Sequence, residues 1–111
     1  MTGESPSPPV LVYIPNQRGS RLASEVLRSS GFAVRRAETI PELELALELL
    51  FYKVIVTTTS KIGEVRDLSN LPIVNIQAFV LPNMDASTAE QPSFFDRTAF
   101  LKRVQILSDS R

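Results

Sequence analysis

The sequence contains no cysteine and no histidine. Without cysteine, neither a disulfide framework nor a thiolate nucleophile is possible. Without histidine, the chain lacks the commonest metal ligand and the usual general base near neutral pH. The twelve basic and twelve acidic side chains cancel, so the net charge does not favour binding to nucleic acid or to an anionic membrane. We therefore expect a protein that uses no metal or cofactor and binds neither nucleic acid nor membrane.

Long hydrophobic runs are missing as well. No apolar stretch approaches the ~20 residues needed to span a bilayer, and the N-terminus lacks the pattern of a signal peptide. A cytoplasmic location is the resulting expectation. Residues 1–9, MTGESPSPP, are rich in serine and proline and are expected to form a disordered tail. The rest is long enough for one domain with a hydrophobic core, which we place at residues 10–108, before a short tail at 109–111.

Short apolar runs alternate with segments whose apolar residues recur at helical spacing. The runs predict strands at residues 10–14, 32–36, 53–57, 73–79 and, very short, 93–95. The spaced segments predict helices at residues 20–29, 39–50, 60–68 and 98–107. Residues 80–92 show no periodicity and are expected to form a loop, with one helical turn near 86–90. The alternation predicts an α/β domain in which a parallel sheet carries helices on both faces.

Local signals mark the ends of three predicted helices. Thr39 and Glu42 form a capping box, in which each side chain bonds to the backbone NH of the other residue. Asp96 is placed to cap the last helix. Gly31 suits the left-handed position that follows a helix.

Three threonines, Thr57, Thr58 and Thr59, end the third predicted strand. Ligands of open parallel sheets bind at the carboxyl ends of the strands, so these residues bear directly on function. They form either a small polar pocket or a strand end whose hydroxyls bond to nearby backbone. The second interpretation is the simpler one.

The first predicted strand is followed by Asn16, Gln17 and Arg18. Free backbone amides, the Arg18 guanidinium and the dipole of the next helix provide groups that hold an anion, although an ordinary connecting loop is the simpler interpretation. With Thr57 and Thr59, these three residues outline a possible ligand crevice.

Three stretches resemble one known family. They are VLVYI at residues 10–14 with EVLRSSGFAV at 25–34, YKVIVTT at 52–58, and FLKRVQIL at 100–107. On these stretches the chain resembles the receiver domain of bacterial two-component response regulators. The resemblance implies a flavodoxin-like, doubly wound fold with five parallel strands in the order 2-1-3-4-5. Residues 80–92 replace the family's fourth helix, which is therefore eroded.

The resemblance also implies five positions for phosphoryl chemistry, and all five depart from the family's pattern. Ile14 and Pro15 stand where an acidic pair helps to hold a divalent cation, and Thr58 replaces the phosphate-accepting aspartate. Gln77 stands at the position of the switch serine or threonine, and Ser93 near that of the lysine. Because no carboxylate is present at these positions to hold a cation beside the phosphoryl group, we expect the aspartyl-phosphate switch to be absent.

Surplus apolar residues suggest contacts with other proteins. Leu45 and Leu49 fall outside the buried stripe of the second predicted helix. With Phe51 they form a possible interaction surface, unless the tail or the long loop covers them. A second possible surface, for which packing in the core is the alternative, comprises Phe94, Phe95, Phe100 and Leu101.

These observations favour a non-catalytic, phosphorylation-independent interaction or dimerisation module of a bacterial signalling or regulatory protein. Its partner is another protein or a second copy of the chain. The alternative is a sensor that binds a small molecule or an anion in the neutral crevice at the carboxyl ends of the strands. An enzyme is the least favoured reading, because the acidic residues are expected mostly on helices, away from that crevice.

Overall fold

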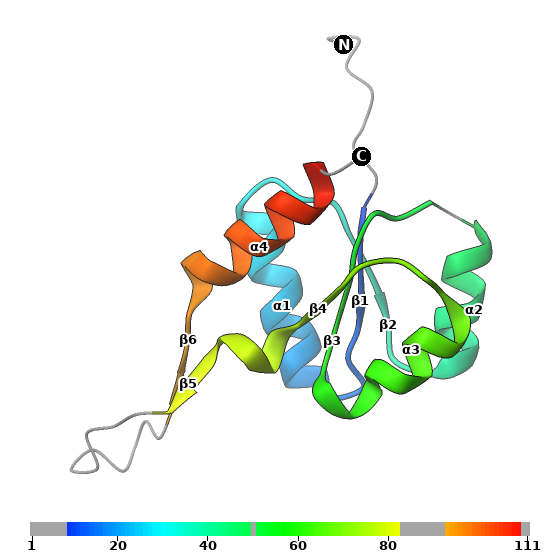
Figure 1. The fold of residues 1–111 in the computed structure, drawn as a ribbon, viewed down its shortest axis with the longest axis horizontal. Coiled ribbons are helices and arrows are strands. Elements are labelled where there is room, and N and C mark those ends of the chain that lie inside the picture. The colour runs from blue at the N-terminus through cyan, green and yellow to red at the C-terminus, as the bar shows by residue number, and fades with distance from the viewer. Residues whose placement is uncertain (1–8, 50, 83–92, 110–111) are drawn as a thin grey trace, which may run out of the picture.

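The computed structural model describes residues 9–49, 51–82 and 93–109. Its main sheet is parallel and has the strand order β2-β1-β3-β4 (Figure 1). The strands are β1 (Val10–Tyr13), β2 (Val34–Ala37), β3 (Ile55–Thr57) and β4 (Ile73–Asn75). The α-helices in this part of the chain are α1 (Gln17–Ser29), α2 (Ile40–Leu49), α3 (Ile62–Leu68) and α4 (Arg97–Asp109). The predicted parallel α/β architecture is thus confirmed.

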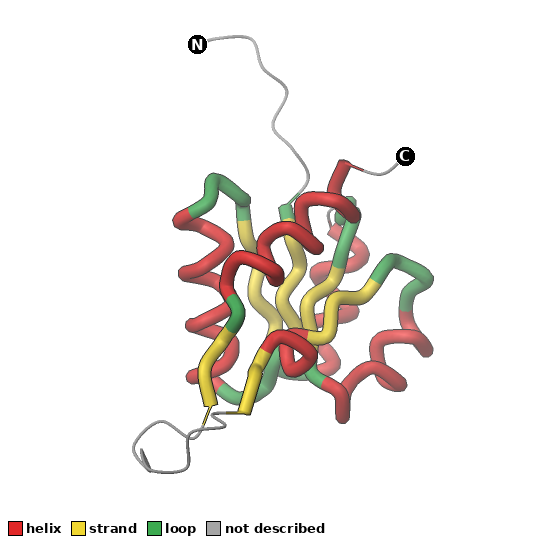
Figure 2. The backbone as a smooth tube through the Cα atoms, turned by 60° about the vertical axis from the view of Figure 1, so that its left-hand side comes forward, coloured by secondary structure: helices red, strands yellow, loops and turns green. Residues whose placement is uncertain are grey.

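The central strands β1 and β3 are buried along their whole length because helices cover both faces of the sheet. Successive side chains of a strand point to opposite faces, so β1 supplies two separate hydrophobic clusters. Val10 and Val12 pack in one cluster with residues of α1 and α4. Leu11 and Tyr13 pack in the other with residues of α2 and α3. The sheet is therefore the middle of three layers, with α1 and α4 on one side and α2 and α3 on the other (Figures 1 and 2).

The strand register brings the carboxyl ends of all four strands to one level. Tyr13 lies opposite Ala37 on one side and opposite Thr57 on the other. Thr57 in turn lies opposite Asn75. Side chains at these positions, and just beyond them, therefore share one edge of the sheet.

Side-chain caps determine where the helices begin. Asn16 accepts a hydrogen bond from the backbone NH of Gly19 at 3.0 Å, so α1 begins three residues earlier than predicted. The backbone NH of Glu42 donates to the Thr39 hydroxyl at 3.2 Å, as predicted. The Glu42 carboxylate, however, accepts from the backbone NH of Glu38 rather than from that of Thr39. Asp96 caps α4 as predicted, through the backbone NH of Ala99 at 3.1 Å.

The chain departs from the predicted fold after β4. The fourth strand was expected to run to Phe79, but it ends at Asn75 and continues as the short 3-10 helix η2 (Ile76–Phe79). The strand β5 (Val80–Pro82) follows, where a loop was expected.

The predicted fifth parallel strand is a strand in a different place. The strand β6 (Ser93–Phe95) pairs antiparallel with β5 in a two-stranded ribbon, not with the main sheet. This ribbon projects away from the sheet (Figures 1 and 2). The reason is that η2 turns the chain away from the sheet before β5 begins, and the backbone NH of Asp96 then donates to the carbonyl of Phe79 at 2.6 Å.

Several predicted features lie outside the described residues. They are most of the N-terminal tail, the helical turn near residues 86–90, and the last two residues of the chain. None of the helices in the described ranges has the length and apolar character needed to cross a membrane.

Candidate functional site

The hydroxyl of Thr57 is occupied by the backbone of the neighbouring strand. Thr57 is fully buried, and its Oγ1 donates to the carbonyl oxygen of Tyr13 at 2.6 Å. A buried hydroxyl needs such a partner, because leaving it unpaired costs about 1–3 kcal/mol. The interpretation of Thr57 as a strand end with backbone-bonded hydroxyl is therefore confirmed.

Side chains also join the ends of β3 and β4 to each other. The Asn75 Nδ2 donates to Thr59 Oγ1 at 2.7 Å. The backbone NH of Thr59 donates to Gln77 Oε1 at 2.8 Å, and the backbone NH of Gln77 donates to Asn75 Oδ1 at 3.0 Å. Thr58, which precedes Thr59, is half-buried. Its backbone carbonyl accepts a hydrogen bond from the backbone NH of Lys61. Of the residues predicted to outline a ligand crevice, Thr57 is thus bonded to the backbone of β1, and Thr59 is bonded to Asn75 and Gln77.

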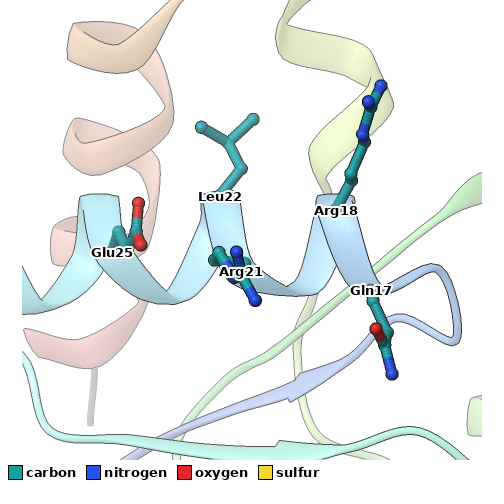
Figure 3. A pocket seen from close by; sticks show the side chains of 5 residues that line it. All are labelled: Gln17, Arg18, Arg21, Leu22 and Glu25. Carbon is teal, nitrogen blue, oxygen red and sulfur yellow. The ribbon is translucent and has the colours of Figure 1, made fainter.

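The residues after β1 open onto a different part of the surface. Asn16 is engaged as the cap of α1. Gln17 and Arg18 are exposed. They line a hollow of about 300 Å³ on the outer side of α1 (Figure 3). Its other lining residues are Arg21, Leu22 and Glu25. All lining residues belong to α1, so the structure does not bring Gln17 and Arg18 into one pocket with Thr57 and Thr59.

The five positions implied by the receiver resemblance do not all lie together in the structure. Ile14 is buried in the cluster beneath α1, whereas Pro15 is exposed. Ser93 pairs with Pro82 in the β5–β6 ribbon, so it does not lie beside β4 at the carboxyl edge as expected. No group of three or more His, Cys, Asp or Glu side chains able to hold a metal ion occurs in the described part of the chain.

One acidic side chain does reach the carboxyl edge of the sheet. The Tyr13 hydroxyl donates to the Glu64 carboxylate at 2.9 Å, and Lys61 Nζ lies 3.2 Å from the other carboxylate oxygen. The expectation that the helical acidic residues lie away from this edge is therefore wrong for Glu64. A tyrosine in a buried strand needs a partner for its hydroxyl, and this was the available signal for such a contact.

The pKa values of this cluster are shifted by its geometry. Burial first, and then the hydrogen bond and charge of Glu64, raise the pKa of Tyr13 to about 12. The hydrogen bond from Tyr13, followed by that from Lys61, lowers the pKa of Glu64. Both shifts favour a neutral phenol that donates to an ionised carboxylate. The cluster thus fixes α3 against the end of β1.

The outer surface of α2 is the most apolar exposed feature at the predicted positions. Leu45, Leu49 and Phe51 are 51%, 59% and 70% exposed. Leu45 and Leu49 are one helical turn apart, while Leu43 and Ala46 on the opposite side of α2 are buried. We call this surface, Leu45, Leu49 and Phe51 with the exposed flanking Glu44 and Glu48, the α2 face. Leu45 and Leu49 were predicted correctly to lie outside the buried stripe of this helix.

The second predicted interaction surface belongs to the core instead. Phe100 is fully buried, and its ring lies 5.2 Å from that of Phe95 and 5.8 Å from that of Phe79. Leu101 and Phe95 are partly buried and pack against the same cluster. Phe94 pairs with Leu81 along the backbone of the β5–β6 ribbon. Core packing, the stated alternative, is thus correct for Phe95, Phe100 and Leu101.

Comparison with known proteins adds no family to this description. A scan against protein-family models finds none that matches the chain, and a search of curated proteins finds no significant similarity.

Proposed function

We propose that this chain is a non-catalytic, receiver-like protein-interaction module of a bacterial signalling or regulatory protein, and that the α2 face is its docking surface. The observation that carries the proposal is the exposure of Leu45, Leu49 and Phe51. A single exposed leucine is ordinary on a soluble protein. Three large apolar groups on one helix and the residues after it favour a surface that a partner covers.

Burial of the apolar side chains of the α2 face would contribute a substantial free energy to association. Complete burial of one leucine or phenylalanine side chain is worth about 1.5–3 kcal/mol. Leu45 and Leu49 are about half exposed, so a partner that covers both, together with Phe51, gains several kcal/mol. This gain offsets part of the free energy that association costs through lost translational and rotational freedom.

The receiver-like assignment is supported by topology, and the lack of catalysis by residue types. The order β2-β1-β3-β4 equals that of the first four strands of a flavodoxin-like sheet. The main sheet differs from that fold at its edge. Among the described residues, no strand pairs with β4 on the side where the fifth strand of a flavodoxin-like sheet belongs. Ile14, Pro15 and Thr58 offer no carboxylate for a cation or for a phosphoryl group.

The alternative of a sensor has weaker support. The Thr57 hydroxyl, the Thr59 hydroxyl and the Gln77 amide are hydrogen-bonded within the chain. A ligand at this edge would have to replace those bonds. The interaction module needs no such exchange.

Incubation with acetyl phosphate and magnesium tests the proposed lack of phosphotransfer. We expect the intact mass of the protein to stay unchanged, because no carboxylate stands at the acceptor position. Covalent phosphate on any residue of the chain contradicts the proposal.

The docking surface is tested by charged substitutions on α2. The double variant Leu45→Glu with Leu49→Glu places two carboxylates in the proposed contact, which are costly to bury there. The matched control is Leu68→Glu, which adds the same side chain on α3, where Leu68 is 37% exposed. Circular dichroism and thermal unfolding establish that each variant is folded.

Two binding measurements are then made on the wild type and on both variants. Sedimentation velocity reports self-association, and affinity capture with mass spectrometry reports other proteins held by the wild type. We expect the α2 double variant to lose whichever association the wild type shows, while Leu68→Glu keeps it. Equal binding by the α2 double variant and the wild type in both measurements overturns the proposal.

A further inference from the structure

The charges of this neutral chain are divided between the two sides of the sheet. Helix α1 carries three arginines and one glutamate, and α4 carries three basic side chains and one acidic one. Helix α2 carries three glutamates and no basic residue, and α3 carries two acidic side chains and one basic one. Because α1 and α4 cover one face of the sheet and α2 and α3 the other, the molecule has a basic side and an acidic side.

The acidic side includes the α2 face. Glu44 and Glu48 flank the Leu45–Leu49 stripe and are exposed. The ion pairs formed among the described residues are Arg36–Glu38 and Lys61–Glu64. Glu44 and Glu48 therefore have no cationic partner in this part of the chain, and their charges are available to a molecule that covers the leucines.

The basic side offers a hollow of matching character. Its apolar residue, Leu22, is 41% exposed and lies next to Arg21 and one helical turn after Arg18 along α1. Arg18 and Leu22 project to one side of the hollow and Arg21 to the other (Figure 3). Glu25, the acidic residue of α1, also lines the hollow. Because two arginines line it against one glutamate, its net charge is positive. Neither Arg18 nor Arg21 takes part in an ion pair with another described residue.

We propose that the α2 face docks in the α1 hollow of a second copy of this chain. This inference rests on the proposed function and names the partner of the same surface. Leu45 and Leu49 cover Leu22, and Glu44 and Glu48 face Arg18 and Arg21 of the other copy. The apolar contact supplies affinity, while the opposite charges around it fix the orientation and disfavour contacts between like surfaces.

The position of the two surfaces determines the kind of assembly. The α1 hollow and the α2 face lie on opposite sides of the sheet (Figure 1). One surface therefore meets a different surface on the next copy, which is a head-to-tail contact. Such a contact leaves a free hollow and a free face at the two ends, so the assembly grows beyond a dimer into a ring or an open chain. Two helix surfaces form a small interface with exposed charges, so association is weak and decreases with added salt.

Sedimentation velocity tests this geometry with two complementary variants. Arg18→Glu with Arg21→Glu disables the hollow but leaves the α2 face intact. Leu45→Glu with Leu49→Glu disables the face but leaves the hollow intact. In each variant alone, we expect the dissociation constant for self-association to rise at least about tenfold. In an equimolar mixture, one intact hollow meets one intact face, so the two variants form a one-to-one dimer that does not grow further.

Lys102→Glu with Arg103→Glu on α4 is the matched control, since it makes the same change of charge away from the hollow. We expect this variant to associate through the same contact as the wild type. Association lost in the α4 variant but retained in the α1 variant overturns the assignment to α1, and so does an equimolar mixture that stays monomeric.

Other outcomes separate this inference from the proposed function. A wild type that is monomeric up to about 1 mM, a concentration at which even weak contacts are populated, overturns the inference. The proposed function then still stands if the α2 double variant loses a protein that the wild type captures. Wild-type association of the α2 double variant, together with unchanged capture, overturns both.

Discussion

Tyr13 and Tyr52 are the two tyrosines of the chain, and both are buried on the same side of the sheet. Their hydroxyls have different surroundings. The Tyr13 hydroxyl donates to Glu64 at 2.9 Å, whereas that of Tyr52 has no hydrogen-bond partner among the described residues. Because an unpaired buried hydroxyl is costly, removing the hydroxyl should destabilise the protein at Tyr13 but not at Tyr52.

The variant Tyr13→Phe should lower the free energy of unfolding by about 1–2 kcal/mol, because a hydrogen bond to a carboxylate is lost. The variant Tyr52→Phe should leave stability unchanged or raise it by about 1 kcal/mol, because an unpaired hydroxyl is removed. Urea unfolding at pH 7 measures both. Equal destabilisation by the two variants contradicts the assignment of these hydroxyls.

The stability contributed by Tyr13 should be lost in alkali. Its pKa is about 12 in the folded protein against about 10 in an unfolded chain. Between these values the unfolded state releases the proton and the folded state keeps it, so unfolding is favoured as pH rises. The contribution is complete below pH ~10 and decreases by about 2–3 kcal/mol toward pH ~12. In urea unfolding at several pH values, the stability advantage of the wild type over Tyr13→Phe should shrink over this window and then reverse, because the loss of about 2–3 kcal/mol exceeds the advantage of about 1–2 kcal/mol at pH 7; a constant difference contradicts the shift.

At the scale of the elements, the end of α1 depends on the backbone of one residue. Gly31 has a φ of 92°, in the left-handed region that glycine adopts without steric cost. Its NH donates to the carbonyl of Arg28, and the NH of Phe32 donates to that of Leu27. These bonds satisfy the last carbonyls of α1 and direct the chain into β2.

The variants Gly31→Ala and Gly63→Ala should therefore differ in sign. An alanine at residue 31 meets no atom within 4 Å but adopts a strained φ, which costs about 1–2 kcal/mol. An alanine at residue 63 also meets open space within the helix α3, where it should add about 0.4–1 kcal/mol by restricting the unfolded chain. Thermal unfolding distinguishes the two, and a stabilising Gly31→Ala would be incompatible with the observed helix end.

The sequence predicts correctly those features that depend on residues close together in the chain, such as helix caps and the buried side of a helix. Helix caps involve residues three or four positions apart, which explains why Thr39 and Asp96 were placed correctly. The spacing along α2 likewise separates the buried Leu43 from the exposed Leu45 and Leu49. These features require no knowledge of which elements meet in space.

Contacts between distant elements were not predictable in this way. Tyr13 and Glu64 are 51 residues apart, and only the packing of α3 against β1 brings them together. The apolar and polar residues 73–79 fit a strand locally, but the bond from the Gln77 NH to Asn75 and the bond from Thr59 to Gln77 favour a turn after Asn75. The pairing of β6 with β5 then follows from this turn and not from the composition of residues 93–95.

At the scale of the whole molecule, the threonine hydroxyls at the carboxyl end of β3 are hydrogen-bonded within the chain, whereas apolar side chains on the outer surface of α2 are exposed. Thr57 and Thr59 are bonded within the chain, and Ile14 is in the core. Leu45, Leu49 and Phe51 are the large apolar side chains that are exposed among the described positions singled out from the sequence. The central claim is accordingly that another protein molecule, either a partner or a second copy of this chain, covers the α2 face in the cell.

Photo-crosslinking at Phe51 tests that claim most directly. The residue is 70% exposed, so replacement by a photoreactive phenylalanine analogue retains an aromatic ring without disturbing the core. The same analogue at Arg66, an exposed position on α3, is the matched control. The account predicts that illumination of the protein in its source cells yields a specific adduct with a protein at position 51 and not at position 66, identified by mass spectrometry. Equal or absent protein adducts at the two positions would contradict it.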